Sequence, residues 1–407
     1  MRTFKKSSKL DHVCYDVRGP VLDEANRMQA DGIDVLKLNI GNPAPFGFSA
    51  PEEVITDMIS TLRSAQGYSD SHGIFAARKA IMQYAQTKNI PNVSMEHIYT
   101  GNGVSELINL VTQGLIDNGD EILVPSPDYP LWTGCVTLAG GKAVHYICDE
   151  QSEWYPDIED MRSKITDKTK AIVIINPNNP TGAVYPKEVL EQIVELAREH
   201  ELMIFSDEIY DRLVMDGIEH TSIASLAPDL FCITLNGLSK SHMIAGFRCG
   251  WMILSGNKAI AQDYIEGIRM LSNMRLCSNV PAQSIVQTAL GGYQSVSNYL
   301  TPGGRIYEQR ECIYQALKDI PGLSVVKPKA AFYMFPKLDV KKFHITNDEQ
   351  FALDLLRDKK ILLIHGGGFH WEQPDHFRVV YLPRIEVLKE SADKIADFLS
   401  YYQQNRR

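Results

Sequence analysis

The chain has 407 residues, more than one simple hydrophobic core holds, so we expect two domains or one large domain with an appendage. A hydrophobic content of 44% and a charged content of 22% are typical of a folded globular protein, and the net charge of −9 argues against a nucleic-acid partner. No apolar run reaches the ~18 residues of a membrane span, and the basic start MRTFKKSSKLDHVCYD lacks the apolar core of a secretory signal. The seven cysteines are scattered, without a C-x-x-C pair or a histidine cluster at metal-ligand spacing. We therefore expect a cytoplasmic protein with reduced thiols, no metal site and no membrane partner.

The predicted elements begin with a short helix over residues 21–31. From about residue 95, short apolar runs alternate with longer helical patterns, of which residues 186–200 are the clearest. The apolar runs are HIYTGNG, EILVPSPDYP, AVHYIC, KAIVIINPNNPTG, LMIFSDE, FCITLNG and GFRCGWMIL. This alternation predicts an α/β layer with a mostly parallel sheet that helices cover on both faces.

After about residue 300 the pattern changes, and TPGGR is expected to mark a domain boundary. A long helix over residues 306–320 follows, then the strands LSVV, FYMFPKL, ILLIHGG and HFRVVYL, and a final helix from about residue 385. These elements predict a second, smaller α/β domain. We expect a large domain over residues 46–300 and a small domain built from residues 1–45 and 301–407.

Polar motifs follow several predicted strands, and ligands in such sheets bind beyond the carboxyl ends of the strands. Asn179 lies in the turn after residues 171–175, and Lys240 follows the run FCITL. Asp207 and Tyr210 lie in SDEIY, directly after LMIF. Each motif alone has an ordinary alternative: a turn asparagine, a helix-capping aspartate or a solvated lysine. In the functional interpretation, Asn179 donates a hydrogen bond to an anion and Asp207 stays ionised against a cationic ring nitrogen.

The stretch TGNGVSEL, residues 100–107, predicts a strand–turn–helix junction whose backbone N–H groups favour a phosphate. It is neither a dinucleotide fingerprint nor a P-loop, and a glycine-rich helix cap is the alternative. Arg248 and Arg378 lie within or beside apolar strands, where each needs an anion: a phosphate, a carboxylate or a structural ion pair. HGGGF, residues 365–369, resembles the oxyanion-hole glycines of lipases, but the chain has no G-x-S-x-G elbow, so we expect a flexible loop there and no hydrolase.

Together these features suit one cofactor. A lysine for a Schiff base, an acid for a pyridinium nitrogen, amides with an arginine for a phosphate, and a second arginine for a carboxylate match pyridoxal 5′-phosphate acting on an amino acid. The chain resembles the class I/II pyridoxal-phosphate aminotransferases (fold type I), and within them the bacterial alanine transaminases. The resemblance covers KLNIGNPAPFGF, AQGYSDSHG, GNGVSEL, PSPDYPLW, NPNNPTGAVY, DEIYD, NGLSK, AGFRCGW and FRVVYLPR.

The resemblance implies a large domain with a mostly parallel seven-stranded sheet, a smaller α/β domain and a homodimer with shared active sites. It implies ping-pong transamination of L-alanine and 2-oxoglutarate to pyruvate and L-glutamate, through an aldimine at Lys240 and pyridoxamine phosphate, in amino-acid biosynthesis. The implied catalytic residues are Lys240, Asp207 and Tyr210. The implied cofactor-binding residues are these three with Gly103, Val104, Ser105, Tyr129, Asn179, Ser239, Arg248 and, from the partner subunit, Tyr68. The implied substrate-binding residues are Gly41, Asn179 and Arg378, and we add Tyr15 and Arg18, the latter for the distal carboxylate of glutamate.

Two alternatives stay open within this fold: a transaminase with an aromatic, branched-chain or methionine preference, and a pyridoxal-phosphate β-lyase. A cofactor-binding transcriptional sensor would need a DNA-binding module, which neither the first ~40 residues nor the net charge supplies. The chain departs from its relatives at His242-Met243, where a Tyr-Arg pair is common, and in the glycine-rich loop HGGGFHWEQ. Both departures bear on substrate preference rather than reaction type.

Overall fold

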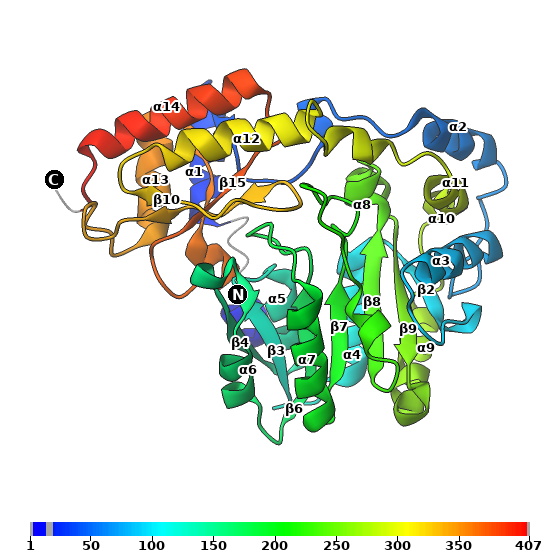
Figure 1. The fold of residues 1–407 in the computed structure, drawn as a ribbon. Coiled ribbons are helices and arrows are strands. Elements are labelled where there is room, and N and C mark those ends of the chain that lie inside the picture. The colour runs from blue at the N-terminus through cyan, green and yellow to red at the C-terminus, as the bar shows by residue number, and fades with distance from the viewer. Residues whose placement is uncertain (1–2, 14–18, 405–407) are drawn as a thin grey trace.

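The computed structural model describes residues 3–13 and 19–404, and a single large sheet dominates its lower part in Figure 1. The strand order is β2-β9-β8-β7-β6-β3-β4-β5. Strands β3, β4, β6, β7 and β8 pair in parallel, whereas β9 runs antiparallel to both its neighbours. The predicted seven strands are present, and a two-residue eighth strand, β5, pairs antiparallel with β4. The bounds are β2 (Ile98–Gly101), β3 (Glu121–Ser126), β4 (Lys142–Asp149), β5 (Tyr155–Pro156), β6 (Thr169–Ile175), β7 (Met203–Asp207), β8 (Phe231–Gly237) and β9 (Gly250–Gly256).

Helices cover both faces of this sheet, as the alternation of apolar runs predicts. One buried cluster joins the strands to α4 (Val104–Leu115), α5 (Leu131–Ala139) and α9 (Gln262–Met274). A second cluster joins them to α3 (Phe75–Thr87), α6 (Ile158–Lys164), α7 (Lys187–Glu199), α10 (Val280–Ser284) and α11 (Val286–Gly291), and α2 (Glu52–Thr61) packs on α10 and α11. In α7, Leu190, Ile193, Val194 and Ala197 are buried at i, i+3, i+4 and i+7, the spacing of one helix face.

A second layer of helices lies above the carboxyl ends of β7 and β8 in Figure 1. It contains α12 (Arg305–Lys318), α13 (Asp348–Lys359) and α14 (Ile385–Tyr401), with a three-stranded antiparallel sheet ordered β11-β15-β14. The strands are β11 (Tyr333–Met334), β14 (Ile364–His365) and β15 (Phe377–Val380), and β10 (Leu323–Ser324) pairs with β12 (Lys337–Leu338).

The amino-terminal segment packs with this second layer. Strand β1 (Leu36–Lys37) pairs in parallel with β13 (Ile361–Leu362), and α1 (Pro20–Ala30) packs against α13. Val21, Ala25 and Met28 share one buried cluster with α12, α13 and α14. The division into residues 46–300 and residues 1–45 with 301–407 stays a prediction, and this packing fits it.

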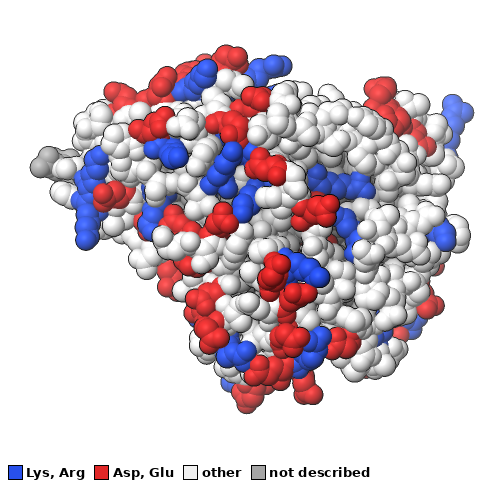
Figure 2. Space-filling model, viewed as in Figure 1, with Lys and Arg blue, Asp and Glu red and all other residues white. Residues whose placement is uncertain are grey.

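The surface in Figure 2 carries both signs of charge, with Asp and Glu gathered toward the lower edge and Lys and Arg interspersed among acids. Among the described residues, no helix is both long and apolar enough to span a membrane.

Candidate active site

A cavity of about 420 Å³ opens at the carboxyl ends of β6, β7 and β8. Its volume lies in the range of ordinary small-molecule sites. It is lined by residues from both layers of the molecule: Ile40, Gly41, Asn42, Val104, Ser105, Tyr129, Ile175, Asn179, Asp207, Ile209, Tyr210, Ser239, Lys240, Ala245, Arg248, Tyr333 and Arg378. Motifs more than three hundred residues apart in the chain therefore meet in one place, as the strand-end rule predicts.

Lys240 reaches the cavity because β8 ends at Gly237 and the short helix α8 (Leu238–Ser241) begins directly after it. Its Nζ donates a hydrogen bond of 2.6 Å to the carbonyl oxygen of Gly41. The same amine lies 6.0 Å from the centroid of the Tyr210 ring. The amine is thus held at the cavity wall by a neutral acceptor and an aromatic face.

Asp207 is the last residue of β7 and is buried. Burial raises the pKa of its carboxyl to about 6, although hydrogen bonds from Trp132 and from the backbone N–H of Ile209 lower it. The Trp132 indole N–H donates to Asp207 Oδ2 at 3.3 Å. A cationic ring nitrogen in the cavity would favour the charged form of this carboxyl, so the surroundings of Asp207 suit an acid that pairs with a cationic ligand.

The wall formed by Gly103, Val104, Ser105 and Arg248, here called the α4 wall, is the amino-terminal turn of α4 with one arginine folded over it. Gly103 has a φ of +81°, and a Cβ at this position would lie 2.1 Å from Arg248 Nη2. Arg248 donates from Nη1 to the carbonyl of Ala245 at 2.8 Å and from Nη2 to that of Asn102 at 3.3 Å. Glycine is therefore required at position 103, and backbone N–H groups and a guanidinium share one surface that suits a phosphate.

The wall formed by Asn39, Asn179, Tyr333 and Arg378, here called the β15 wall, lies where the two layers meet. Arg378 on β15 is buried and donates from Nη1 to Asn179 Oδ1 at 2.8 Å and from Nη2 to the carbonyl of Asn39. Its guanidinium also lies 4.4 Å from the Tyr333 ring centroid. Neutral oxygens and ring faces orient this cation at the cavity, which is the setting that binds a carboxylate with two parallel hydrogen bonds.

Tyr210 and Tyr333 both line the cavity, and their hydroxyls form a hydrogen bond of 2.6 Å. Burial raises the pKa of the Tyr210 hydroxyl well above its ordinary value, and the neighbouring Tyr333 raises it further. Tyr210 therefore keeps its proton and can donate it in a hydrogen bond. Gly41 lies against the Tyr333 ring, where an added Cβ would come within 2.1 Å of Tyr333 Oη.

Most of the residues singled out in the sequence line this cavity. Gly103 is not among the lining residues, although its neighbour Val104 is. Tyr68 is 83% exposed and does not line the cavity within this chain. Tyr15 and Arg18 lie outside the described residues. The roles of all the site residues, those that line the cavity included, stay predictions at this point.

The two departures from related sequences have structural roles. His242-Met243 does not line the cavity, whereas the glycine-rich turn packs under Arg378, which does. His242 is buried, with Nδ1 2.8 Å from Ser241 Oγ and Nε2 2.8 Å from the carbonyl oxygen of Ala289, and Met243 is buried in the core. The expected loop at HGGGF is wrong in form, because Gly366–Phe369 fold as a turn of 3-10 helix whose Gly367 N–H donates to Asp348 Oδ2. Phe369 is buried under Arg378, 4.6 Å from its guanidinium.

Trp132 and Tyr333 contribute to the site but were missed in the sequence, as was Asn39, whose carbonyl accepts from Arg378. Trp132 lies in PDYPLW, where its only sequence signal is its place beside Tyr129 at a strand end. Tyr333 lies in the apolar strand FYMFPKL, where a tyrosine reads as an ordinary core residue. Both act through contacts with residues that are distant in sequence, so local patterns do not single them out.

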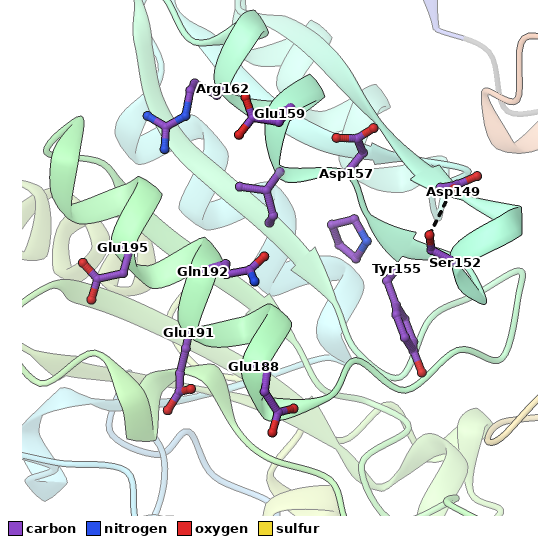
Figure 3. Close-up of a pocket in the computed structure, with 12 residues that line it drawn as sticks. Asp149, Ser152, Tyr155, Asp157, Glu159, Arg162, Glu188, Glu191, Gln192 and Glu195 are labelled. Carbon is purple, nitrogen blue, oxygen red and sulfur yellow. Dashed lines mark hydrogen bonds between the residues drawn. The ribbon is translucent and has the colours of Figure 1, made fainter.

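A larger hollow of about 830 Å³ lies elsewhere, between α6 and α7 (Figure 3). Glu188, Glu191 and Glu195 line it from α7, and Asp157 and Glu159 line it from the start of α6. Its arginine, Arg162, already pairs with Glu199 at 2.6 Å. A surface so rich in carboxylates repels phosphates and carboxylic acids, so it is a poor site for the ligands that the first cavity suits.

The residues of the first cavity fit pyridoxal 5′-phosphate. Gly103, where a Cβ would meet Arg248, leaves the amino terminus of α4 open to a phosphate, and buried Asp207 offers a partner for the ring nitrogen. Tyr210 can donate to a ring oxygen, and the Lys240 amine is the group that would hold the cofactor covalently.

Comparison with known proteins agrees with this picture. The family model described as "Aminotransferase class I and II" matches residues 33–395. The glutamate-pyruvate aminotransferase AlaA of Haemophilus influenzae is 60% identical and covers 99% of this chain and 100% of that protein. The alanine aminotransferase of Mycobacterium tuberculosis is 53% identical, over 99% of this chain and 94% of that protein. The crystal structure of an aminotransferase from Escherichia coli superposes with a TM-score of 0.98 at 60% identity, over 99% of this chain and 100% of that one.

Proposed function

The chain belongs to the class I and II aminotransferases and depends on pyridoxal 5′-phosphate, and we propose that it exchanges amino groups between L-alanine and 2-oxoglutarate to give pyruvate and L-glutamate. The similarity to proteins named glutamate-pyruvate and alanine aminotransferase supports this choice of substrates. One observation carries the proposal. The Lys240 amine, the buried Asp207 carboxyl, the α4 wall and the β15 wall all surround the same cavity.

When bound, the cofactor supplies a carbonyl carbon that condenses with amines and a ring that accepts electrons from the substrate Cα. Asp207 keeps a positive charge on the ring nitrogen favourable because it is an acid buried next to that position. Arg248 and the first N–H groups of α4 would hold the phosphate, and Tyr129, which lines the same cavity, would contact the ring. These residues fix the orientation of the cofactor before any substrate arrives.

The β15 wall and Lys240 act on the substrate. Arg378, held by Asn179 and the Asn39 carbonyl, binds the α-carboxylate and so fixes the direction of the Cα–H bond. The Lys240 amine would take the proton from the substrate Cα as general base and give it up again as general acid. The second half of the cycle reverses these steps with another 2-oxo acid, so ping-pong kinetics are expected.

The reaction type is tested by incubating the holoenzyme with L-alanine and 2-oxoglutarate. Equal amounts of pyruvate and glutamate are expected. Pyruvate with free ammonia and no glutamate would instead identify a β-lyase, and turnover only with aromatic, branched-chain or methionine donors would replace alanine as the substrate. Borohydride reduction should fix the cofactor on the peptide that contains Lys240, and a label on any other lysine would remove Lys240 from its role.

We also propose a cytoplasmic homodimer in which the partner subunit's Tyr68 completes the phosphate site. Exposed apolar side chains support this, since Phe75 and Met274 are 68% and 78% exposed near the stretch that carries Tyr68. Ser71 Oγ in that stretch donates to Asn273 Oδ1 at 2.7 Å, which brings Tyr68 and Met274 onto one surface. Light scattering should give twice the chain mass, and Tyr68→Phe should weaken cofactor retention without changing that mass.

A further inference from the structure

Three side chains outside the catalytic residues converge on one point beside the cavity. Asp128 lies between β3 and α5, His145 lies on β4, and His370 follows the turn Gly366–Phe369. One carboxylate oxygen and two ring nitrogens of these residues all lie within 4.8 Å of one another. The sequence shows no histidine pair at metal-ligand spacing, because the fold draws the three ligands from segments that are far apart in the chain.

The two imidazoles direct nitrogens at the same carboxylate. His370 Nδ1 lies 2.7 Å from Asp128 Oδ1, and His145 Nε2 lies 3.7 Å from Asp128 Oδ2. The two rings stack with centroids 4.8 Å apart and planes inclined by 21°. A divalent cation beside this carboxylate, near the edges of the two rings, would take one neutral nitrogen from each ring as a ligand.

Asp128 offers a charged ligand in a protected position. Its side chain is fully buried. Thr133 Oγ1 donates to Asp128 Oδ2 at 2.7 Å and lies 2.9 Å from His145 Nε2. The hydroxyl can therefore orient the carboxylate from behind, as partners of metal ligands commonly do.

The backbone that presents His370 is held on both sides. Ser126 Oγ donates to the carbonyl of His370 at 2.7 Å, and the Asp128 N–H donates to the carbonyl of Phe369 at 2.9 Å. His370 adopts a φ of +55°, a left-handed conformation that a residue with a side chain rarely takes. The surrounding hydrogen bonds thus keep a costly backbone geometry that aims the imidazole at Asp128.

We propose that Asp128, His145 and His370 form a binding site for a divalent transition metal of the zinc type. Two imidazole nitrogens and one carboxylate oxygen, without a thiolate, suit Zn²⁺ and Co²⁺, and three protein ligands leave one position for water. The metal joins the segment of Tyr129, which lines the cavity, to the turn of Phe369, which lies under Arg378. A bound metal would therefore connect the segment of Tyr129, which is proposed to contact the cofactor, with the turn that packs under Arg378, which is proposed to bind the substrate carboxylate. This site is independent of the proposed substrates.

The test is titration of the metal-free, cofactor-loaded protein with Zn²⁺ by calorimetry, repeated with Co²⁺ by visible absorption. One equivalent is expected to bind with a Kd of about 10 µM or tighter and to raise the melting temperature. His370→Asn and His145→Gln should each weaken binding at least about tenfold, whereas His344→Asn, an exposed histidine, should bind as the wild type does. Equal binding by all variants, or none by the wild type, would overturn the site.

A measurement on the unaltered protein keeps the test decisive if the variants fold poorly. X-ray absorption of the zinc-loaded wild type should show a shell of nitrogen and oxygen only, with the outer scattering of two imidazoles. Sulfur ligands would place the metal on cysteines and overturn the assignment.

Discussion

The α4 wall and the β15 wall both present an arginine to one cavity, but they are built differently. Arg248 is held by the backbone of its own neighbourhood and of Asn102, next to a glycine whose missing Cβ makes room for it. Arg378 is held by residues from two distant segments, Asn39 and Asn179, and by the ring of Tyr333. The α4 wall depends on local backbone shape, whereas the β15 wall depends on contacts between distant segments. Substitutions in the two walls should therefore impair different properties of the enzyme: cofactor affinity in the first and use of the substrate in the second.

The largest effect is expected from Arg378→Ala in the β15 wall. Loss of a buried, bidentate carboxylate partner should lower kcat/KM for alanine about 1000-fold, or about 4 kcal/mol, while the cofactor stays bound. Steady-state kinetics with cofactor absorbance separate the two properties. Arg162→Ala, which removes only a surface ion pair, is the control and should change kcat/KM little. Cofactor loss in Arg378→Ala would show that the two walls are not separate.

Gly103→Ala should break the α4 wall instead. The new Cβ displaces the Arg248 guanidinium, so cofactor affinity should fall about 100-fold, or about 2.7 kcal/mol, with a normal KM for alanine once the enzyme is saturated with cofactor. Gly32→Ala is a matched control because Gly32 has the same φ of +81° but no atom within 4 Å of an added Cβ. Equal affinity losses in both variants would assign the effect to backbone strain rather than to Arg248.

Glu208→Gln changes a buried acid that follows Asp207 in the sequence but does not line the cavity. It should therefore change the stability of the protein while leaving both walls intact. Burial raises the pKa of Glu208 from 4.5 to about 8, although Ser222 and Ser206 donate to it at 2.8 and 2.9 Å. Between pH 4.5 and about 8, the folded protein therefore holds a proton on Glu208 that the unfolded chain releases. The contribution of this proton to the free energy of unfolding is fully present below pH 4.5 and is lost as the pH rises toward 8. The slope is about 1.4 kcal/mol per pH unit.

Denaturant unfolding of the Glu208→Gln and wild-type proteins between pH 5.5 and 7.5 checks this expectation. The variant should lose this part of the pH dependence and be the more stable protein at the upper pH, with alanine kinetics near those of the wild type. Parallel stability curves for the two proteins would contradict a protonated Glu208.

Tyr333→Phe should have the smallest effect. The ring that faces Arg378 remains, and only the 2.6 Å hydrogen bond to Tyr210 is lost, so kcat should fall about fivefold, or about 1 kcal/mol. Tyr401→Phe, on an exposed tyrosine, is the control. A loss as large as that of Arg378→Ala would mean that the Tyr210–Tyr333 pair, rather than the arginine, organises the β15 wall.

Local patterns in the sequence predict the α4 wall better than the β15 wall. GNGVSEL shows the helix start that exposes the N–H groups of the α4 wall. The alternation of strands and helices also places Asp207, Lys240 and, from the β15 wall, Asn179 at one sheet edge. Tyr333 gives no such signal, because its role comes from contacts with Tyr210 and Arg378 across the molecule. The form of HGGGF was predicted wrongly for the same reason, since distant Asp348 anchors that turn.

The contacts of Arg378 also bear on how the protein is made. Its partners Asn179 and Asn39 precede it by 199 and 339 residues. A chain growing on the ribosome completes the α4 wall and the segment of Lys240 long before β15 emerges, and domains generally fold as they appear. The nascent protein can therefore form its cofactor pocket early, but it lacks Arg378, the proposed ligand of the substrate carboxylate, until synthesis is nearly finished. Chains that end before β15 are expected to capture the cofactor and remain catalytically silent.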